Sequence, residues 1–340
     1  MKPYRCLVFG LGQVGRQACR YLLRDGIEIV AAYSRSSHLG DDLGEVVGLS
    51  KVGIRVQASS SFQAHKGLAD IALFFTTSSL ADLLGEARQC LENGIDVLTI
   101  AEDALYPWNH SPALAAELDA IARSGGASLV GGGVNDVAMT HLPAVLGAFT
   151  SGVKRIRVEC AGDFGQFGAA LLDSLPLGLD QAGFDAWVAA AAAAGPHGAS
   201  IAGQSLEALL SLTDQVAASV VEIDLQPTWA DTDLRLSTGA SLSAGSTSGF
   251  IESARVRSTA GVELEIHLIG KVFEPTDKDY LQIDVQAEQP ISLRIGPLPG
   301  VPTTAALVLS RIGDVLAAAP GLQSIDRLPC SRLRLPDRNK

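Results

Sequence analysis

Short apolar runs alternate with helical segments over residues 1–135. Runs rich in β-branched and aliphatic residues predict strands at Arg5–Phe9, Glu28–Tyr33, Ile71–Phe75, Asp96–Ile100 and Ala127–Val130. Apolar residues at helical spacing predict helices at Val14–Arg24, Leu80–Asn93 and Pro112–Ser124. Each helix is followed by a glycine that tolerates positive φ: Gly26, Gly94 and Gly125 or Gly126. This alternation predicts an α/β fold with a doubly wound, parallel Rossmann sheet.

The pattern changes after Val153, where apolar and polar residues alternate strictly. Such alternation predicts strands with one buried face at Lys154–Ala161, Val220–Leu225, Val262–Ile269, Leu281–Ala287 and Ile291–Ile295. Helices are expected at Phe184–Ala194, Ser205–Ala218 and Val301–Ala319, and a flexible loop at Thr238–Ser248. The second half is therefore expected to be an α+β domain on a mixed, largely antiparallel sheet.

The change of pattern predicts three segments along the chain. Residues 1–135 form the dinucleotide-binding domain, residues 136–300 form the substrate and dimerisation domain, and residues 301–340 form a C-terminal helix and tail. We expect the last segment to pack back on the first domain.

Composition narrows the class of partner. The 340-residue chain carries 37 acidic and 26 basic residues, for a net charge of −11, and it has no long Lys/Arg cluster. Binding to nucleic acid or to an anionic membrane is therefore not expected, and a small molecule fits better. The longest apolar helical run, Ala186–Ala194, is about half of what a bilayer requires. Five scattered cysteines without a CxxC pair and the lack of a signal-peptide pattern favour a cytoplasmic protein.

The clearest chemical motif is Gly10-Leu11-Gly12-Gln13-Val14-Gly15, directly after the first strand and before the first helix. In a GxGxxG motif the first glycine makes the tight turn, the second lets the backbone approach a pyrophosphate, and the third allows close helix–strand contact. An ordinary glycine turn is the alternative, but the placement between strand and helix favours a dinucleotide site.

The end of the second strand indicates which dinucleotide. The acid that usually bonds the ribose 2′-OH is missing, and Ser34-Arg35-Ser36-Ser37 stands in its place. A guanidinium with flanking hydroxyls can bind a 2′-phosphate, so NADP(H) is preferred and NAD(H) is possible. The alternative is that Arg35 is a solvated loop charge and that Asp41 or Asp42 serves NAD.

Three further strand ends open on the expected ligand crevice: Thr76-Thr77-Ser78, Ala101-Glu102-Asp103, and Gly131 to Asp136. Glu102 would bring a carboxylate to the nicotinamide ring, or it could instead be a structural cap near Tyr106-Pro107. The predicted cofactor-binding residues are Gly10, Gly12, Gln13, Val14, Gly15, Ser34, Arg35, Ser36, Thr76, Thr77 and Ala101.

Together several segments resemble the 2,4-diaminopentanoate dehydrogenase and native amine dehydrogenase family. They are Gly10–Gly15, Asp41–Gly48, the run GIDVLTIAEDALYPW from Gly94 to Trp108, Thr303–Ala306 and Pro320–Leu322. The resemblance implies an N-terminal domain like that of dihydrodipicolinate reductase and NAD(P)-dependent interconversion of an amine with a carbonyl compound and ammonia. It also implies that Glu102 acts close to the reacting nitrogen and that the chain dimerises through the C-terminal sheet.

The chain departs from the family pattern in places that bear on the substrate. Asp136-Val137 replaces the usual Pro-Gly after Asn135, and Phe167 replaces a usual tyrosine in Gly162–Gly168. The HH and KxDxPSGT segments of a true dihydrodipicolinate reductase are absent, so that activity is not expected. The predicted substrate-binding residues are Asn135, Asp136, Phe164, Phe167 and His267.

His267 lies in the alternating strand Glu263–Leu268, on its polar side with two glutamates. It could bond substrate or hold Glu102 if that side closes the cleft, and otherwise it is a solvated or interface histidine. The other histidines show no metal-ligand spacing, so no metal site is expected.

These observations predict an NADP-preferring enzyme with Glu102 as its catalytic residue, acting on a C–N bond by reductive amination of a small carbonyl compound or by oxidation of the matching amine. An imine reductase, or an amino acid or hydroxy acid dehydrogenase on the same scaffold, is the alternative. A non-catalytic NADP-binding sensor is a third hypothesis.

Overall fold

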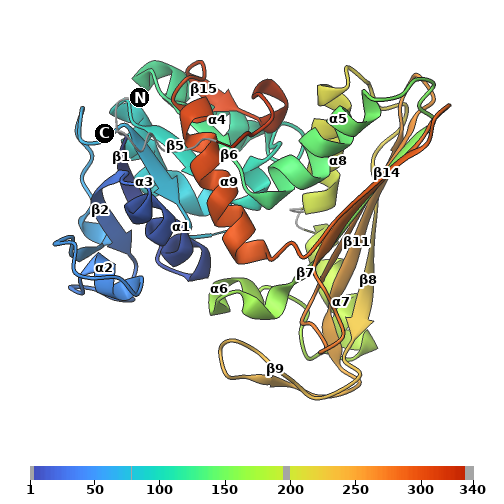
Figure 1. The fold of residues 1–340 in the computed structure, drawn as a ribbon, viewed down its shortest axis with the longest axis horizontal. Helices are drawn as coiled ribbons and strands as arrows, with labels where there is room; N and C mark the ends of the chain where they lie inside the picture. The colour runs from blue at the N-terminus through green and yellow to red at the C-terminus, as the bar shows by residue number, and fades with distance from the viewer. Residues whose placement is uncertain (1–3, 78, 194–199, 334–340) are drawn as a thin grey trace. The chain divides into compact units, whose positions relative to one another are not determined.

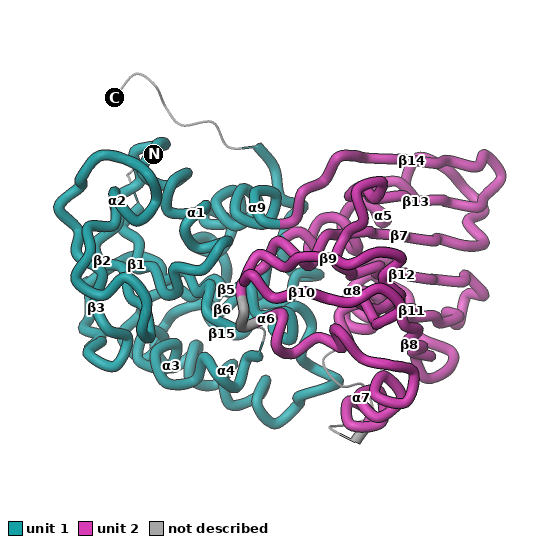
Figure 2. Tube along the Cα trace, turned by 90° about the horizontal axis from the view of Figure 1, so that it is seen from below, with its two compact units in different colours: residues 1–133, 301–340 teal, residues 134–300 magenta. Residues whose placement is uncertain are grey.

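The computed structural model describes residues 4–77, 79–193 and 200–333 (Figure 1). Ser78, Ala194 and residues 334–340, which belong to predicted segments, lie outside the described residues. The chain divides into two compact units, residues 1–133 with 301–340 and residues 134–300 (Figure 2).

Unit 1 contains a seven-stranded sheet in the order β15-β6-β5-β4-β1-β2-β3, in which every pair of neighbours is parallel. Its strands are β1 (Arg5–Phe9), β2 (Glu28–Ser34), β3 (Val56–Ala58), β4 (Ile71–Phe74), β5 (Asp96–Thr99), β6 (Ser128–Gly131) and β15 (Gly321–Gln323). Its helices are α1 (Gln13–Arg24), α2 (Leu43–Val46), α3 (Leu84–Glu92), α4 (Pro112–Gly125) and α9 (Gly300–Val315). Short 3-10 turns are η1 (Ser59–Ser61), η2 (Ala81–Leu83), η3 (Glu102–Ala104) and η6 (Ile325–Arg327). The predicted doubly wound parallel sheet is confirmed.

Three helices of unit 1, α1, α3 and α4, end at the glycines that the sequence predicts. Gly26, Gly94 and Gly126 have φ values of 72°, 71° and 73°, a conformation that other residues rarely adopt. The predicted helix Leu80–Asn93 is in fact split into η2 and α3.

An aromatic stack holds the carboxyl edge of this sheet. Phe9 ends β1 and stacks between Tyr33 of β2, at 4.9 Å between ring centroids, and Phe74 of β4, at 4.4 Å. Phe62 packs edge-on against Phe9 and Tyr33. All four rings are buried, so the ends of three adjacent strands are packed rigidly beneath any ligand bound at that edge.

Unit 2 contains a six-stranded mixed sheet in the order β14-β13-β7-β12-β11-β8, in which only β7 and β12 are parallel. Its strands are β7 (Arg155–Asp163), β8 (Glu222–Trp229), β11 (Thr247–Arg257), β12 (Glu263–Lys271), β13 (Tyr280–Gln286) and β14 (Ile291–Ile295). A separate pair is formed by β9 (Leu234–Arg235) and β10 (Ser241–Leu242). The helical segments are η4 (Asp136–His141, a π-helix), α5 (Leu142–Gly147), η5 (Phe164–Gln166), α6 (Ala169–Leu172), α7 (Gln181–Ala193) and α8 (Ile201–Leu212). The predicted mixed, largely antiparallel sheet is confirmed.

The two faces of this sheet differ sharply. Its core face packs against η4, α5 and α8 (Figure 1), and Ile156, Val158, Leu264, Ile266 and Ile283 point into that core. Its polar face carries the residues between them: Arg155, Arg157, Glu159, Ser253, Arg255, Arg257, Glu263, Glu265, His267, Gln282 and Asp284. Alternation along each strand therefore sorts the side chains as predicted.

The strand β11 was not predicted, and the expected loop Thr238–Ser248 overlaps its first residues and includes β10. The alternation in β11 is broken at Glu252, a carboxylate on the core face. Its Oε2 accepts a hydrogen bond from Ala202 N at 3.1 Å, at the start of α8. The buried charge of Glu252 breaks the strand pattern in the sequence. It is tolerated because the N–H group of Ala202, distant in sequence, donates to it.

The helix predicted at Ser205–Ala218 was displaced. Helix α8 begins at Ile201, where Ser200 Oγ accepts from Gly203 N at 2.9 Å, and ends at Leu212. Asp214 then adopts a φ of 52°, which ends the helix well before Ala218.

Candidate active site

The turn after β1 requires glycine at its first position. Gly10 has a φ of +92°, and its N–H donates to Tyr33 O at 2.8 Å. A Cβ atom on Gly10 would lie 2.6 Å from Phe75 O, directly after β4. The turn is therefore packed against the ends of β2 and β4, the two neighbours of β1, where the strand order reverses.

Gly15 packs the first turn of α1 against this loop, because a Cβ atom there would overlap Gly10 O. A Cβ atom added to Gly12 would have no atom of another described residue within 4 Å, apart from its neighbours in the chain. A ligand can therefore approach the backbone at Gly12. Helix α1, which is described throughout, begins at Gln13 with no side-chain cap and no acidic residue in its first turn. Its first N–H groups and dipole, with Gln13 and Val14 at the start, form an arrangement that fits a pyrophosphate.

A cation follows the end of β2. Arg35 is exposed, and its Nη2 donates to Thr76 O at 3.4 Å, in the loop after β4. Ser36 is exposed beside it, whereas Ser34 is buried and shares a hydrogen bond with Ser37 at 2.9 Å. An exposed guanidinium and hydroxyl at this strand end fit a ribose 2′-phosphate.

The two acids considered for an unphosphorylated ribose have different roles. Asp42 is buried, and its carboxylate accepts from the N–H groups of Gly44, Val52 and Gly53 at 2.9, 3.0 and 2.8 Å. These bonds, that from Val52 first, lower the pKa of Asp42. Asp41 is exposed. Asp42 is thus occupied as the cap of α2, which leaves Asp41 as the acid that could bind the ribose.

The loop after β4 adds Thr76 and Thr77. The methyl group of Thr76 lies 3.0 Å from where a Cβ atom of Gly10 would be, so it touches the glycine turn. Thr77 Oγ1 donates to Asp82 Oδ2 at 3.1 Å and accepts from Ser79 N at 3.0 Å. Thr77 therefore anchors the loop to η2 through its hydroxyl.

Glu102 follows β5 after Ile100 and Ala101, at the start of η3, and is half-buried. The preceding Ala101 is buried, and its N–H donates to Thr99 Oγ1 at 3.0 Å. Ala104 packs closely on Gly131, since a Cβ atom added to Gly131 would lie 2.5 Å from the Ala104 carbonyl carbon. Because β1, β4 and β5 are adjacent and parallel, the glycine turn, the threonine loop and Glu102 belong to one edge of the sheet.

Asp103, which is not among the residues predicted from the sequence, is a second acid at this strand end. It is 9% exposed, and its Oδ1 accepts a hydrogen bond from Leu80 N at 2.5 Å. Burial raises the pKa of Asp103 to about 7. Its only signal in the sequence is its place beside Glu102 after a predicted strand.

In unit 2, Asn135 precedes the π-helix η4 and is half-buried, whereas Asp136 is 1% exposed. Asp136 Oδ1 lies 3.4 Å from Nε2 of His141, which is 3% exposed. The carboxylate thus faces a buried imidazole within its own unit, and this pairing argues for a structural role of Asp136. His141 is therefore a buried residue paired within unit 2.

Phe164 and Phe167 are brought together, with ring centroids 6.0 Å apart at an angle of 87°. A Cβ atom on Gly270 would overlap the Phe164 ring, so this ring lies over the core face of β12. Phe250 packs at 6.0 Å from Phe164, and Trp187 at 5.7 Å from Phe250. Neither Phe250 nor Trp187 was predicted for the site, because Phe250 lies in the unpredicted strand β11 and Trp187 of α7 reaches the cluster only through Phe250.

His267 points to the polar face of the same sheet, on the other side from Phe164. It is 12% exposed at its side chain; Nδ1 shares a hydrogen bond with Ser253 Oγ at 2.8 Å, and Nε2 lies 2.8 Å from Glu265 Oε1. Because the sheet separates the two residues, His267 and Phe164 cannot line one site within this unit. We do not retain His267 as a substrate ligand.

Glu265 is the centre of the charges on the polar face. Its side chain is 7% exposed and accepts from Arg155 and, at 2.8 Å, from Arg255 Nε. Burial by itself raises the pKa of Glu265, but the hydrogen bonds from Arg155 and His267 outweigh burial and lower it to about 2. The carboxylate is therefore strongly held in its charged form.

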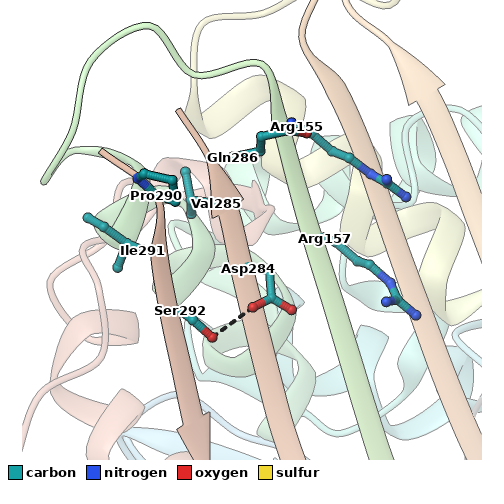
Figure 3. A pocket seen from close by; sticks show the side chains of 8 residues that line it. All are labelled: Arg155, Arg157, Asp284, Val285, Gln286, Pro290, Ile291 and Ser292. Atoms are coloured by element: carbon teal, nitrogen blue, oxygen red, sulfur yellow. Dashed lines mark hydrogen bonds between the residues drawn. The ribbon is translucent and has the colours of Figure 1, made fainter. Parts of the chain in front are cut away.

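A shallow hollow of about 330 Å³ also lies on the polar face, between β7, β13 and β14 (Figure 3). It is lined by Arg155, Arg157, Asp284, Val285, Gln286, Pro290, Ile291 and Ser292. Its charges are paired with neighbours: Arg155 bonds Glu265, Arg157 bonds Glu159 at 2.8 Å, and Ser292 donates to Asp284 at 2.7 Å. We assign it no ligand.

Over the described ranges, His, Cys, Asp and Glu side chains do not gather in a group of three or more that could hold a metal. In the same part of the chain, no helix has the length and apolar character needed to span a membrane.

Comparison with known proteins gives consistent matches. Residues 4–99 match the family model of the dihydrodipicolinate reductase N-terminus. The 2,4-diaminopentanoate dehydrogenase of Acetoanaerobium sticklandii is 23% identical over 99% of this chain and 96% of its own length. The amine dehydrogenase of Mycobacterium smegmatis is 31% identical over 98% of both chains, and its structure superposes with a TM-score of 0.90.

More distant structures share the fold alone. GenD2 from gentamicin A biosynthesis, solved in complex with NAD, is 14% identical, with a TM-score of 0.55 over 96% of this chain and 90% of its own.

Proposed function

From the premise that this chain belongs to the amine dehydrogenase family and is an NAD(P)-dependent dehydrogenase acting on amines, we propose that it is a cytoplasmic homodimer that interconverts a small amine with the matching carbonyl compound and ammonia, with NADP(H) as the preferred cofactor. The observation that carries the proposal is the position of Glu102. This half-buried carboxylate follows β5 at the sheet edge that holds the glycine turn.

The residues at this edge fit a phosphorylated dinucleotide. Gly12 leaves the backbone open, the start of α1 offers N–H donors, and Arg35 supplies a cation where a 2′-phosphate would lie. We propose that the cofactor is held by Gly10, Gly12, Gln13, Val14, Gly15, Ser34, Arg35, Ser36, Thr76, Thr77 and Ala101. Of the two serines, exposed Ser36 is the better placed to donate to phosphate, because the Ser34 hydroxyl is buried.

When bound, NADP(H) supplies or accepts the hydride, so the protein must orient the substrate, move protons and exclude water. Glu102 takes a proton from ammonium, which frees the nitrogen lone pair to attack the carbonyl. The same carboxyl group then donates a proton to the hydroxyl of the carbinolamine, which leaves as water. Asn135, Phe164 and Phe167 remain the proposed substrate-binding residues, with the two phenyl rings forming an apolar wall.

Initial rates with a panel of small amines and NADP, and with the matching ketones or aldehydes and NADPH, test the function. We expect reduction of the carbonyl compound to depend on added ammonium. Reduction of a preformed imine without any ammonium-dependent activity would indicate an imine reductase. Tight NADPH binding with no turnover across the panel would indicate a sensor.

Replacing Arg35 with alanine should weaken NADPH binding by roughly 10–100-fold, the worth of charged hydrogen bonds, and leave NADH binding nearly unchanged. Dissociation constants for both nucleotides can be measured by fluorescence titration. Arg24→Ala is the matched control, because Arg24 is exposed at the far end of α1 and pairs with Asp25. Equal affinity of the wild type for NADPH and NADH would contradict NADP preference.

Dimerisation should occur through the polar face of unit 2. There Ile251 pairs with Ile269, which pairs with Ala161, and so forms an apolar row between charged rows. Sedimentation should show a dimer for the wild type and a monomer for Ile269→Arg, since a buried unpaired charge would disrupt the contact. Val216→Arg, at an exposed loop position, is the control. A wild-type monomer at high micromolar concentration would refute the assembly.

A further inference from the structure

We propose that Asp103 is a positioning residue that holds the loop after β4, with Thr76 and Thr77, in a fixed place relative to Glu102. The inference rests on the proposed function, because it concerns the same cofactor edge and the same catalytic carboxylate. The hydrogen bond from Leu80 N to Asp103 Oδ1, at 2.5 Å, joins the two strand ends directly.

The described residues of the loop after β4 also make contacts on its cofactor side. Its near end touches the glycine turn through Thr76, and the exposed Arg35 contacts its backbone. Thr77 bonds Asp82, a residue of η2, the 3-10 turn that begins directly after Leu80. Leu80 itself is buried, so its N–H bond to Asp103 is shielded from water and fixes the far end of the loop.

The turn that carries Asp103 is firmly fixed from the other side. Ala104 N donates to Ala101 O at 3.0 Å, and Ala104 packs against the backbone of Gly131 at the end of β6. Glu102 belongs to the same 3-10 turn. A displacement of the loop relative to Asp103 is thus a displacement relative to Glu102.

The carboxylate of Asp103 is energetically unfavourable at this buried position. Burial, and to a smaller extent the nearby charge of Asp82, raise the pKa of Asp103 to about 7, so the position disfavours the charged form. An apolar residue would avoid this penalty but would leave the buried Leu80 N–H without an acceptor. Asp103 therefore serves to keep the hydrogen bond between the loop after β4 and the turn after β5.

The test compares Asp103→Ala, Asp103→Asn and a matched control, Asp96→Ala, by NADPH titration and thermal unfolding. Asp96 also accepts a backbone hydrogen bond, from Ser128 N at 2.6 Å, but lies at the opposite end of β5. We expect Asp103→Ala to raise the Kd for NADPH roughly tenfold, through loss of one buried hydrogen bond. Asp103→Asn, whose amide oxygen can still accept, should recover most of the affinity.

Asp96→Ala should lower the unfolding temperature with little change in the Kd for NADPH. Wild-type affinity in Asp103→Ala, no rescue by asparagine, or an equal loss in Asp96→Ala would overturn the proposal. Nucleotide titration needs no amine. A wild type that binds NADPH but turns over no amine would refute the proposed function, while the comparison of variants would still decide the role of Asp103.

Discussion

Replacing Glu102 with glutamine should lower turnover by roughly 10²–10⁴-fold, the usual worth of general acid–base catalysis, with NADPH affinity within about twofold of the wild type. Glutamine keeps the size and hydrogen-bonding capacity of the side chain but cannot exchange a proton with ammonium or carbinolamine. The half-buried position past β5 suits a group that must meet both cofactor and substrate. Steady-state rates and NADPH titration of the purified variant measure the two quantities.

Glu92→Gln is the matched control, because Glu92 is an exposed glutamate on α3 that pairs with Arg88. Its turnover should equal that of the wild type. If Glu102→Gln also turns over within a few-fold of the wild type, then Glu102 is structural and the proposed chemistry fails.

Acidification should destabilise the protein through Glu265. Its pKa is about 2 in the folded protein and 4.5 in the unfolded reference, so the stability it contributes is present above pH 4.5 and is lost as pH falls towards 2. The shift corresponds to at most about 3 kcal/mol, and to about 2 kcal/mol once solvent at the polar face screens the charges. Urea unfolding at pH 7, 5 and 3 measures the free energy.

Glu265→Gln should lose this stability at pH 7, and its free energy of unfolding should fall less than that of the wild type between pH 5 and pH 3. Glu263→Gln is the control on the same strand, since its side chain is 47% exposed and pairs with Arg257 at the surface. Parallel pH profiles for the wild type and Glu265→Gln would contradict the assignment.

Much of unit 1 could be predicted from sequence. Strand β1 has the predicted bounds, as does β14 in unit 2, and the glycine turn, the helix-ending glycines and the resemblance to amine dehydrogenases are confirmed. These features are local or nearly so: the φ of a turn residue and the period of apolar positions depend on neighbours in sequence. Glu102 could be selected for the same reason, because a parallel strand delivers the next residue to the carboxyl edge.

What sequence alone could not decide involves partners distant in the chain. Glu252 looks incompatible with a strand until α8 supplies its N–H donors, so β11 and Phe250 were missed. The occupation of Asp42 by backbone N–H groups is likewise a tertiary fact.

Periodicity correctly assigned His267 to a polar side of its strand, but only the tertiary structure shows that Phe164 lies on the other side of the sheet. In the same way, the hydrogen bond between Leu80 and Asp103 joins loops after two different strands. The sequence by itself determined the backbone conformations and the two-sided character of each strand, because these depend on short-range sterics and spacing. Which charges are satisfied, and which side chains share a site, was decided by the packing of elements far apart in the chain.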